Sequence, residues 1–411
     1  MSRARGTGRT DATGRDEEPG RTEDAGRTRP GRTDVTSGGE DTGRPDNTGR
    51  NESTGRTGPG RTGSADGRGD TGLDGPGRTE TGRGGEGVGR ADGGTGAGGP
   101  LRAPRVRWVV VGAGGLLGRE MTGFLGERGD DVVALPRRAL DITDAGACAA
   151  VIRRGDVVVN AAAWTAADDA ELDEDRAFTA NAYGPAVLAR TCAAAGARLV
   201  HVSTDYVFHE APGGPHDAAP TPYAEDDLPR PRSAYGRTKA AGEWAVQALC
   251  PDHLIVRTAW LYGRYGACFP LSIVRRLREH GEVRVVDDQF GQPTWTRDVA
   301  RLVVELVLAA APSGTYHATA AGWTSWHAFA RAVAAADGAD PALVRPATTA
   351  GIGRRAPRPA FSALGHDAVH RVAAAGADVA PIGPWQERWS YASALVLGAL
   401  GPGPERADAA H

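Results

Sequence analysis

A valine-rich run that leads into a cluster of glycines limits most strongly what this chain can fold into. Residues 106–111 are mainly apolar, the glycines follow at once, and residues 117–125 repeat large apolar side chains at helical spacing. An apolar run without polar alternation is typical of a strand buried on both faces of a parallel sheet. The pattern therefore predicts a buried strand, a tight turn and a helix, which is the first unit of an α/β sheet.

Alternating strand and helix patterns continue after this unit. The predicted strands are residues 131–135, 156–160, 198–203 and 253–257, and the predicted helices are residues 174–195 and 234–249. Such alternation predicts an α/β fold with a doubly wound parallel sheet and right-handed crossovers. Beyond Trp260 the pattern is less regular, with helices expected at 269–279, 297–311 and 325–336 and a strand at 283–286. We expect a smaller substrate-facing lobe there, with the chain rejoining the main sheet once or twice.

Composition divides the chain into four parts. Residues 1–104 are dominated by Gly, Arg, Thr, Asp and Pro, with too few large apolar side chains to form a core. We predict a disordered low-complexity tail there. A dinucleotide-binding domain is expected at 105–260, a mainly substrate-binding lobe at 261–390, and a C-terminal tail at 391–411.

Charge and cysteine content exclude several classes of protein. A net charge of −3 argues against a nucleic-acid partner, and no apolar run approaches the roughly 20 residues of a membrane span. The four cysteines are widely spaced, which favours free thiols over a disulfide framework or a zinc site. We therefore expect a soluble cytoplasmic protein without a metal centre.

The glycine cluster is the candidate phosphate-binding turn. Glycines lack Cβ, so backbone N–H groups at the start of a helix can approach a pyrophosphate. The expected binding residues are Gly112, Gly114, Gly115, Leu116, Leu117 and Gly118. An acidic residue after the second strand would favour NAD, but Arg137 stands there and the first carboxylate is Asp141. NADPH is therefore the predicted cofactor, and NADH is the alternative.

The only lysine of the chain marks a candidate catalytic group. Lys239 follows Tyr235 by four residues, so both side chains share one face of the predicted helix. Thr204 ends a predicted strand, at the edge of the sheet where ligands bind in doubly wound folds. A cation near a phenol lowers the pKa of that phenol, and Thr204 can bond the same reacting oxygen. Tyr235 is thus the predicted proton donor in the reduction of a carbonyl.

These motifs resemble the extended short-chain dehydrogenase/reductases, and among them the dTDP-4-dehydrorhamnose reductases. The resemblance covers residues 106–389 and includes the segments 112–118, 140–143, 159–163, 203–208, 235–243, 257–262, 288–294 and 358–364. It implies a Rossmann domain that binds NADPH and a dTDP-4-keto-6-deoxysugar substrate, reduced at the 4-keto group to dTDP-L-rhamnose.

The resemblance also implies roles for single residues. Asp141 and Ile142 would lie by the adenine, and Val202, Tyr235 and Lys239 by the cofactor. Thr204, Asp205 and Trp260 would contact the sugar. Three small residues would line the dinucleotide, namely Ala161, Ala162 and Ala163. Some members form dimers through carboxylates and Mg²⁺. Glu120 matches one such position, and a homodimer is the expected assembly, but no metal is predicted.

Three alternatives stay open, and one relative is excluded. A nucleotide-sugar 4,6-dehydratase needs an Asp-Glu pair after the threonine, whereas here Asp205 is followed by Tyr206. A reductase of another dTDP-4-keto-deoxysugar, an epimerase and a non-catalytic regulatory subunit of the same fold remain. The chain departs from the family after Phe208, where a longer loop runs to Pro222 and borders the expected substrate mouth.

Overall fold

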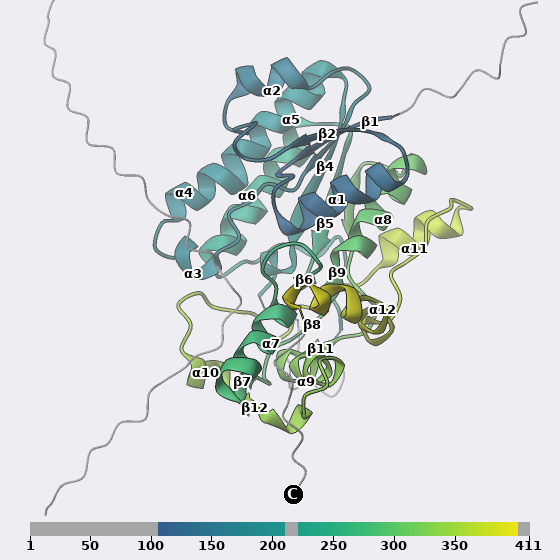
Figure 1. The fold of residues 1–411 in the computed structure, drawn as a ribbon. Coiled ribbons are helices and arrows are strands. Elements are labelled where there is room, and N and C mark those ends of the chain that lie inside the picture. Colours follow the sequence, from purple (N-terminus) through teal and green to yellow (C-terminus); the bar gives the residue numbers. More distant parts are fainter. Residues whose placement is uncertain (1–105, 210–220, 402–411) are drawn as a thin grey trace, which may run out of the picture.

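The structure is a computed structural model that describes residues 106–209 and 221–401 (Figure 1). In these residues a central sheet of six parallel strands has the order β10-β5-β4-β3-β1-β2. The strands are β1 (Arg107–Val111), β2 (Asp131–Leu135), β3 (Val157–Asn160), β4 (Arg198–Thr204), β5 (His253–Thr258) and β10 (Gly314–His317). The strand order reverses between β1 and β3, which places the ligand-binding crevice of such a sheet at their carboxyl ends.

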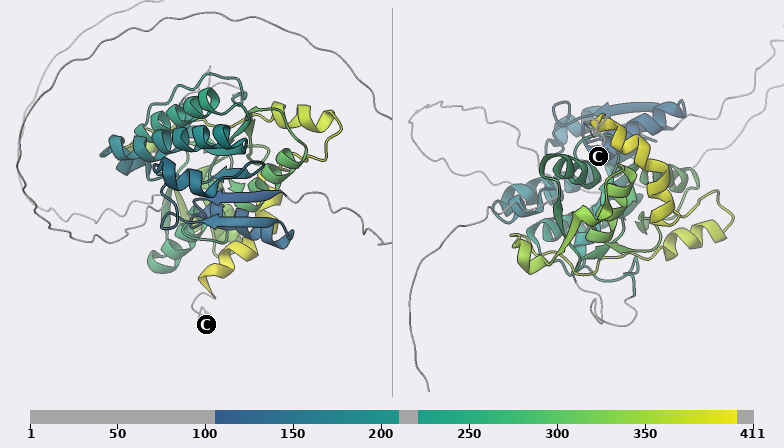
Figure 2. Two further views of the ribbon diagram at one scale, coloured as in Figure 1. Left: turned by 90° about the horizontal axis from the view of Figure 1, so that it is seen from above. Right: turned by 60° about the horizontal axis from the view of Figure 1, so that its bottom comes forward.

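Helices cover both faces of the sheet (Figures 1 and 2). One face carries α1 (Leu116–Glu127) and α8 (Thr296–Leu308), and the other carries α2 (Ala145–Val151), α5 (Gly184–Ala195) and α6 (Ala234–Leu249). The side chains of alternate residues of β1 point to the two opposite faces of the sheet. Trp108 and Val110 pack with α1 and α8, whereas Val109 and Val111 pack with α2, α5 and α6. This two-sided burial explains the apolar run in the sequence and confirms the doubly wound fold.

The predicted helix at 174–195 is a continuous helical segment with a local distortion. It consists of α4 (Glu174–Phe178), a π-helical turn (Thr179–Tyr183) and α5. A short helix, α3 (Ala167–Ala170), precedes it. The π-helical turn carries Asn181, whose side chain is fully buried. Single π-helical turns inside longer helices often occur at functional sites.

A smaller lobe lies beyond the carboxyl ends of the strands, in the lower part of Figure 1. Its helices are α7 (Phe269–His280), α9 (Trp326–Ala336), α10 (Thr349–Ile352) and α12 (Trp385–Leu397). Short strands pair there as β6 (Leu261–Tyr262) with β9 (Thr294–Trp295), β7 (Val283–Val286) with β12 (Val344–Ala347), and β8 (Phe290–Gly291) with β11 (Thr324–Ser325). The chain also returns to the main sheet at β10, beside which α11 (Asp367–Ala374) packs.

The expected C-terminal tail begins too early. Tyr391 lies in the middle of α12, and Ala392, Val396 and Leu397 are buried. The apolar segment continues the helix that Trp385 starts and contributes buried side chains to the core. The remainder of that tail from residue 402, the predicted tail at 1–104 and most of the loop after Phe208 lie outside the described residues.

The structure also bears on the predictions about the cysteines and about membrane-spanning segments. All four cysteines are free, as their spacing predicted, and the structure places all four in buried positions. Among residues 106–209 and 221–401, no helix combines the length and apolar character required to cross a bilayer.

Candidate active site

The glycine turn forms a closed cradle at the start of α1. Gly112 has φ +76°, and a Cβ there would lie 2.5 Å from the backbone nitrogen of Ala162. A Cβ on Gly118 would collide with the carbonyl of Gly112. Gly114 and Gly115 are exposed, and a Cβ on either would make only one ordinary contact, at 3.5 Å. The turn therefore fits the phosphates of a dinucleotide, because Gly112 and Gly118 permit the tight packing and the exposed glycines let a ligand approach the backbone.

The segment after β3 lies against this turn. The backbone N–H of Ala161 donates to the carbonyl of Val111 at 2.9 Å, and that of Ala162 donates to Asn160 Oδ1 at 3.1 Å. Ala163 is exposed. The structure thus brings the predicted alanines beside the glycine turn at the switch point of the sheet, with Asn160 holding their loop.

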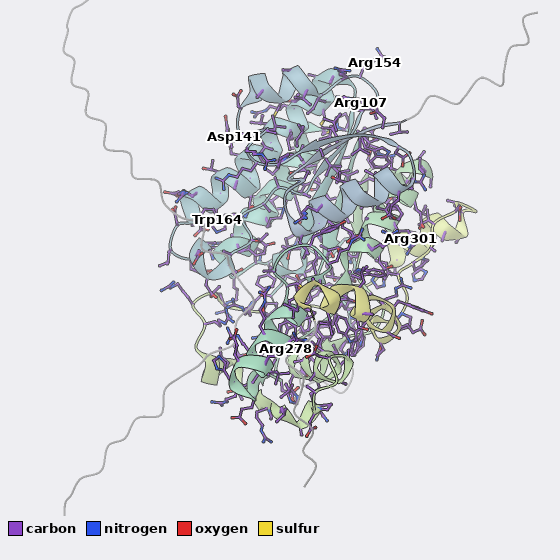
Figure 3. All side chains as sticks on the ribbon, in the orientation of Figure 1. Arg107, Asp141, Arg154, Trp164, Arg278 and Arg301 are labelled. Carbon is purple, nitrogen blue, oxygen red and sulfur yellow. The ribbon has the colours of Figure 1, made fainter. Side chains whose placement is uncertain are left out.

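The end of β2 presents the residues expected to select the cofactor. Arg137 is exposed, and Asp141 is exposed nearby, while Ile142 is buried. Asp141 accepts two hydrogen bonds from Thr143, at 2.9 Å and 2.8 Å, and these bonds lower the pKa of its carboxyl, as Arg137 also does. Figure 3 labels Asp141, on the same side of that view as Trp164. The carboxylate of Asp141 is therefore charged at neutral pH, and the guanidinium of Arg137 favours this charged form.

Thr204, Asp205 and Tyr235 form one contiguous cluster at the carboxyl end of β4. The Thr204 hydroxyl donates to Asp205 Oδ1 at 3.0 Å, and Ser362 donates to Asp205 Oδ2 at 2.6 Å. Burial raises the pKa of Asp205 to about 6, although both hydroxyls oppose the shift. Burial also raises the pKa of the Tyr235 phenol, and the hydroxyl of Thr204 opposes this shift as its hydrogen-bond partner. Tyr235 is therefore protonated at neutral pH and can donate a proton.

Lys239 lies one helical turn from Tyr235 and is only 2% exposed. Its Nζ donates to the carbonyl of Val202 at 2.7 Å and lies 3.4 Å from His201 Nε2. Burial lowers the pKa of Lys239 to about 8, while Glu243 on the same helix opposes the shift. The carbonyl of Val202 therefore accepts a hydrogen bond from Lys239. The resemblance had implied that Val202 lies by the cofactor.

A pocket with a cavity volume of about 50 Å³ opens beside this cluster, and Tyr206 belongs to both. The rings of Tyr206 and Tyr235 meet edge to face with centroids 5.5 Å apart. The pocket is lined by Tyr206, Phe269, Val285, Val286, Gln289, Trp326, Thr349, Ile352, Arg354 and Arg358. Both arginines bond Asp168, Arg354 at 3.1 Å and Arg358 at 2.9 Å. The two guanidinium groups and the carboxylate of Asp168 thus form a charged wall of the pocket.

Trp260 lies behind the pocket rather than within its lining. Its indole stacks on Trp326 with centroids 3.6 Å apart and planes at 7°. Its backbone has φ +46°, an unusual conformation for a large residue. Gly291 makes room for the ring, since a Cβ there would lie 2.5 Å from the indole. Such a strained residue is typical of a site where the surrounding fold fixes a side chain for function.

Glu120, which the resemblance related to carboxylates of a dimer, lies buried beside two arginines. It is fully buried on α1, and Arg264 and Arg297 lie 3.5 Å and 3.6 Å from its Oε1. Burial raises the pKa of Glu120, and both arginines oppose that shift. In the described ranges, 106–209 and 221–401, no group of three or more His, Cys, Asp or Glu side chains is placed to hold a metal ion.

Sequence reasoning missed several residues of the site. Asn160 and Arg358 stand within segments that carried the resemblance, yet no local pattern marked them. Ser362 lies in one of these segments as well. Asp168 and Trp326 left no signal, because each reaches the site through a contact between distant parts of the chain. The bond from Arg358 to Asp168 joins residues 190 positions apart.

Comparison with known proteins places the chain in a family. Residues 106–388 match the model of the family described as "RmlD substrate binding domain". A dTDP-4-dehydrorhamnose reductase of Streptomyces griseus is 45% identical, over 73% of this chain and 98% of that protein. The chain belongs to this reductase family. The resemblance drawn from the motifs is thereby confirmed.

Two further relatives bear on substrate and cofactor. A probable dTDP-4,6-dihydroxy-2-methyloxan-3-one 4-ketoreductase of Streptomyces antibioticus is 44% identical, over 74% of this chain and all of that protein (100%). The structure of a dTDP-4-dehydrorhamnose reductase of Bacillus anthracis in complex with NADP is 32% identical. It superimposes with a TM-score of 0.64 over 70% of this chain and 98% of that chain.

Proposed function

We propose that this protein is an NADPH-dependent reductase of the 4-keto group of a dTDP-4-keto-6-deoxysugar, with dTDP-4-dehydro-L-rhamnose as substrate and dTDP-L-rhamnose as product. The cluster of Thr204, Tyr235 and Lys239 beside the glycine turn carries this proposal. It supplies a protonated phenol, a hydroxyl partner and a buried amine at the carboxyl end of β4. The family membership and the NADP complex of the Bacillus anthracis relative support it.

The residues that would hold the cofactor are those of the cradle. Gly112 to Gly118 would receive the phosphates, Ala161 to Ala163 would line the dinucleotide, and Arg137 would face a 2′-phosphate. When bound, NADPH supplies the hydride. The proton comes from Tyr235, which holds it on the phenol at neutral pH because burial raises the pKa of that phenol. Thr204 bonds the same oxygen and orients it, and Asp205 in turn accepts the bond from Thr204.

The pocket beyond Tyr206 is the proposed place of the nucleotide part of the substrate. Arg354 and Arg358 line this pocket, and guanidinium groups suit a diphosphate. Phe269 and Trp326 lie in the same lining and offer aromatic faces to a base. Trp260 would act on sugar orientation through Trp326, since the two indoles are stacked.

A second candidate substrate is another dTDP-4-keto-6-deoxysugar. The Streptomyces antibioticus relative carries a different 4-ketoreductase name at nearly the same identity as the Streptomyces griseus reductase. We also propose a cytoplasmic location and a homodimer as the working assembly, because the substrate and NADPH are cytoplasmic metabolites and the resemblance implies dimers in some members.

The deciding experiment compares two substrates. The full chain is incubated with NADPH and enzymatically prepared dTDP-4-dehydro-L-rhamnose or dTDP-4-keto-6-deoxy-D-glucose, and nicotinamide absorbance is followed. We expect faster oxidation with the rhamnose precursor. A preference for the glucose derivative would favour the second substrate. Folded protein that binds NADPH but oxidises none with either sugar would overturn the reductase and favour the regulatory subunit.

A further inference from the structure

Asn160 fixes the direction of a buried hydrogen-bond chain. The backbone N–H of Ala162 can only donate, and it bonds Asn160 Oδ1 at 3.1 Å. The amide nitrogen of Asn160 must therefore face the other way, toward His201 Nδ1 at 3.1 Å. Since that nitrogen can only donate, His201 Nδ1 must be the acceptor. The backbone thus assigns the amide orientation, which is otherwise ambiguous.

The same logic places the imidazole proton. His201 is fully buried, and its pKa is held well below the ordinary value by burial and by Lys239 beside it. The ring is therefore neutral and carries a single N–H. Because Nδ1 accepts a bond, the proton is on Nε2, the atom that lies 3.4 Å from Lys239 Nζ. A donor of the ring thus faces the lysine.

An ammonium group fits this position poorly. An ammonium has three N–H donors and no acceptor. It can donate to the carbonyl of Val202 at 2.7 Å, but it cannot accept a hydrogen bond from the N–H of His201. A neutral amine keeps a lone pair that accepts from that N–H. Within this packing, a Cβ added at Gly242 would lie only 3.6 Å from His201 Nε2, so α6 passes close to the ring.

Charged groups on the neighbouring elements act on the lysine as well. Glu243 on α6 favours the charged amine. That carboxylate is itself bound by Arg257 of β5, at 2.8 Å and 3.0 Å, and both side chains are buried. The ion pair therefore weakens the support that Glu243 gives to an ammonium.

We propose that His201, held in one tautomer by Asn160, is a positioning residue that presents an N–H to the amine of Lys239 and so allows the lysine to lose its proton near neutral pH. Asn160 also holds the loop of Ala161 and Ala162, so the loop expected to line the dinucleotide and the lysine share one hydrogen-bond chain. Only the consequence for turnover rests on the proposed function. The protonation state itself is a property of the protein alone.

Because Lys239 is the only lysine of the chain, its titration can be read as one signal. The full chain is prepared with isotope-labelled lysine and without a lysine-containing tag, and its side-chain NMR resonance is followed against pH. We expect a midpoint of about 8. His201→Gln can turn a carbonyl oxygen toward the ammonium, so it should raise the midpoint by roughly one pH unit. His253→Gln alters another buried histidine of the sheet and should leave it unchanged.

A second measurement reads the tautomer of His201 directly. Nitrogen-15 spectra of labelled histidine should show His201 protonated on Nε2 in the wild type. In Asn160→Asp a carboxylate oxygen can accept from Nδ1, so the proton should move to Nδ1. An Nδ1-protonated wild-type ring would overturn the proposal. So would a wild-type lysine that titrates near 10.4, its ordinary value, or an unshifted midpoint in folded His201→Gln. None of these readings uses cofactor or substrate, so failure here is distinct from failure of the reductase assignment.

Discussion

At the scale of single residues, the one lysine of the chain lies at a position where an arginine would not fit. The sequence holds 48 lysines and arginines together, and only Lys239 is a lysine. Its Nζ lies between the carbonyl of Val202 and the ring of His201, with 2% of the residue exposed. A guanidinium is larger, planar and always charged, so it can neither occupy this space nor lose its proton there.

Lys239→Arg should therefore reduce kcat, on the order of 10²-fold, a typical contribution of proton-transfer groups. The measurement is the initial rate of NADPH oxidation with the preferred sugar. The matched control is Arg237→Lys, on the same helix but half exposed and paired with Glu174. Full activity in Lys239→Arg would show that the site needs only a positive charge.

Asp205 gives a stability prediction with a definite sign. Its folded pKa of about 6 exceeds the roughly 3.9 of an unfolded aspartate, so the folded state binds the proton more tightly. The stability from this group is complete below about pH 4 and is lost as pH rises through 6. Asp205→Asn removes the charge, so it should raise the free energy of unfolding relative to the wild type by about 3 kcal/mol at pH 7.

The check is chemical denaturation of both proteins at pH 4 and pH 7. The advantage of Asp205→Asn should shrink toward pH 4, where the wild-type carboxyl is protonated. An equal difference at both pH values would mean that Asp205 is charged in the folded protein throughout.

At the scale of elements, local signals predicted the parts that hold the chemistry. Helix α6 runs over Ala234–Leu249, the predicted range, because Ser233 caps it by accepting from the N–H of Gly236 at 3.1 Å. Strands β2 and β7 also have their predicted bounds. By contrast, β10 and β12 have four residues each with little apolar pattern, and only pairing with distant strands defines them.

The candidate site likewise contains features that local sequence predicts and features that depend on distant contacts. Tyr235 and Lys239 are one helical turn apart, so sequence spacing alone predicts that they share a face. The glycine turn is equally local. The charged wall of Arg354, Arg358 and Asp168 depends on a contact between α3 and a loop after α10, which no periodicity encodes.

Gly112→Ala tests the glycine turn as an element. The left-handed backbone and the 2.5 Å approach to Ala162 leave no space for a methyl group. We expect loss of NADPH binding of at least about tenfold and a lower melting temperature. Binding is measured by nicotinamide fluorescence. Gly126→Ala in α1 has no atom within 4 Å of the new Cβ and should bind as the wild type does. Normal binding by Gly112→Ala would place the dinucleotide elsewhere.

At the scale of the whole molecule, one core joins the sheet to the lower lobe. A single buried cluster contains Leu117 of α1, Val303 of α8, Leu271 of α7, Phe329 of α9 and Trp389 of α12. The lobe therefore rests on the same apolar packing as the α1 face of the sheet. This continuity is invisible in sequence, where residue 260 looks like a boundary between two domains.

Deletion of residues 391–411 should consequently destabilise the entire fold. It removes the second half of α12 with its buried Ala392, Val396 and Leu397. Loss of several buried apolar side chains costs on the order of 3 kcal/mol or more. Thermal unfolding provides the measurement, and deletion of residues 402–411, which keeps every described residue, is the control. Equal melting temperatures for the two truncated proteins would mean that the end of α12 adds nothing to the core.

The central claim is that this fold brings a hydride and the proton of Tyr235 to the same sugar carbonyl. Its most direct test is to supply NADPH deuterated at nicotinamide C4 and examine the dTDP-sugar product by NMR and mass spectrometry. We expect one deuterium on C4 of dTDP-L-rhamnose. We also expect Tyr235→Phe to bind NADPH normally but to form this product roughly 10²–10⁴-fold more slowly. A product without deuterium at C4, or an unchanged rate in Tyr235→Phe, would contradict this claim.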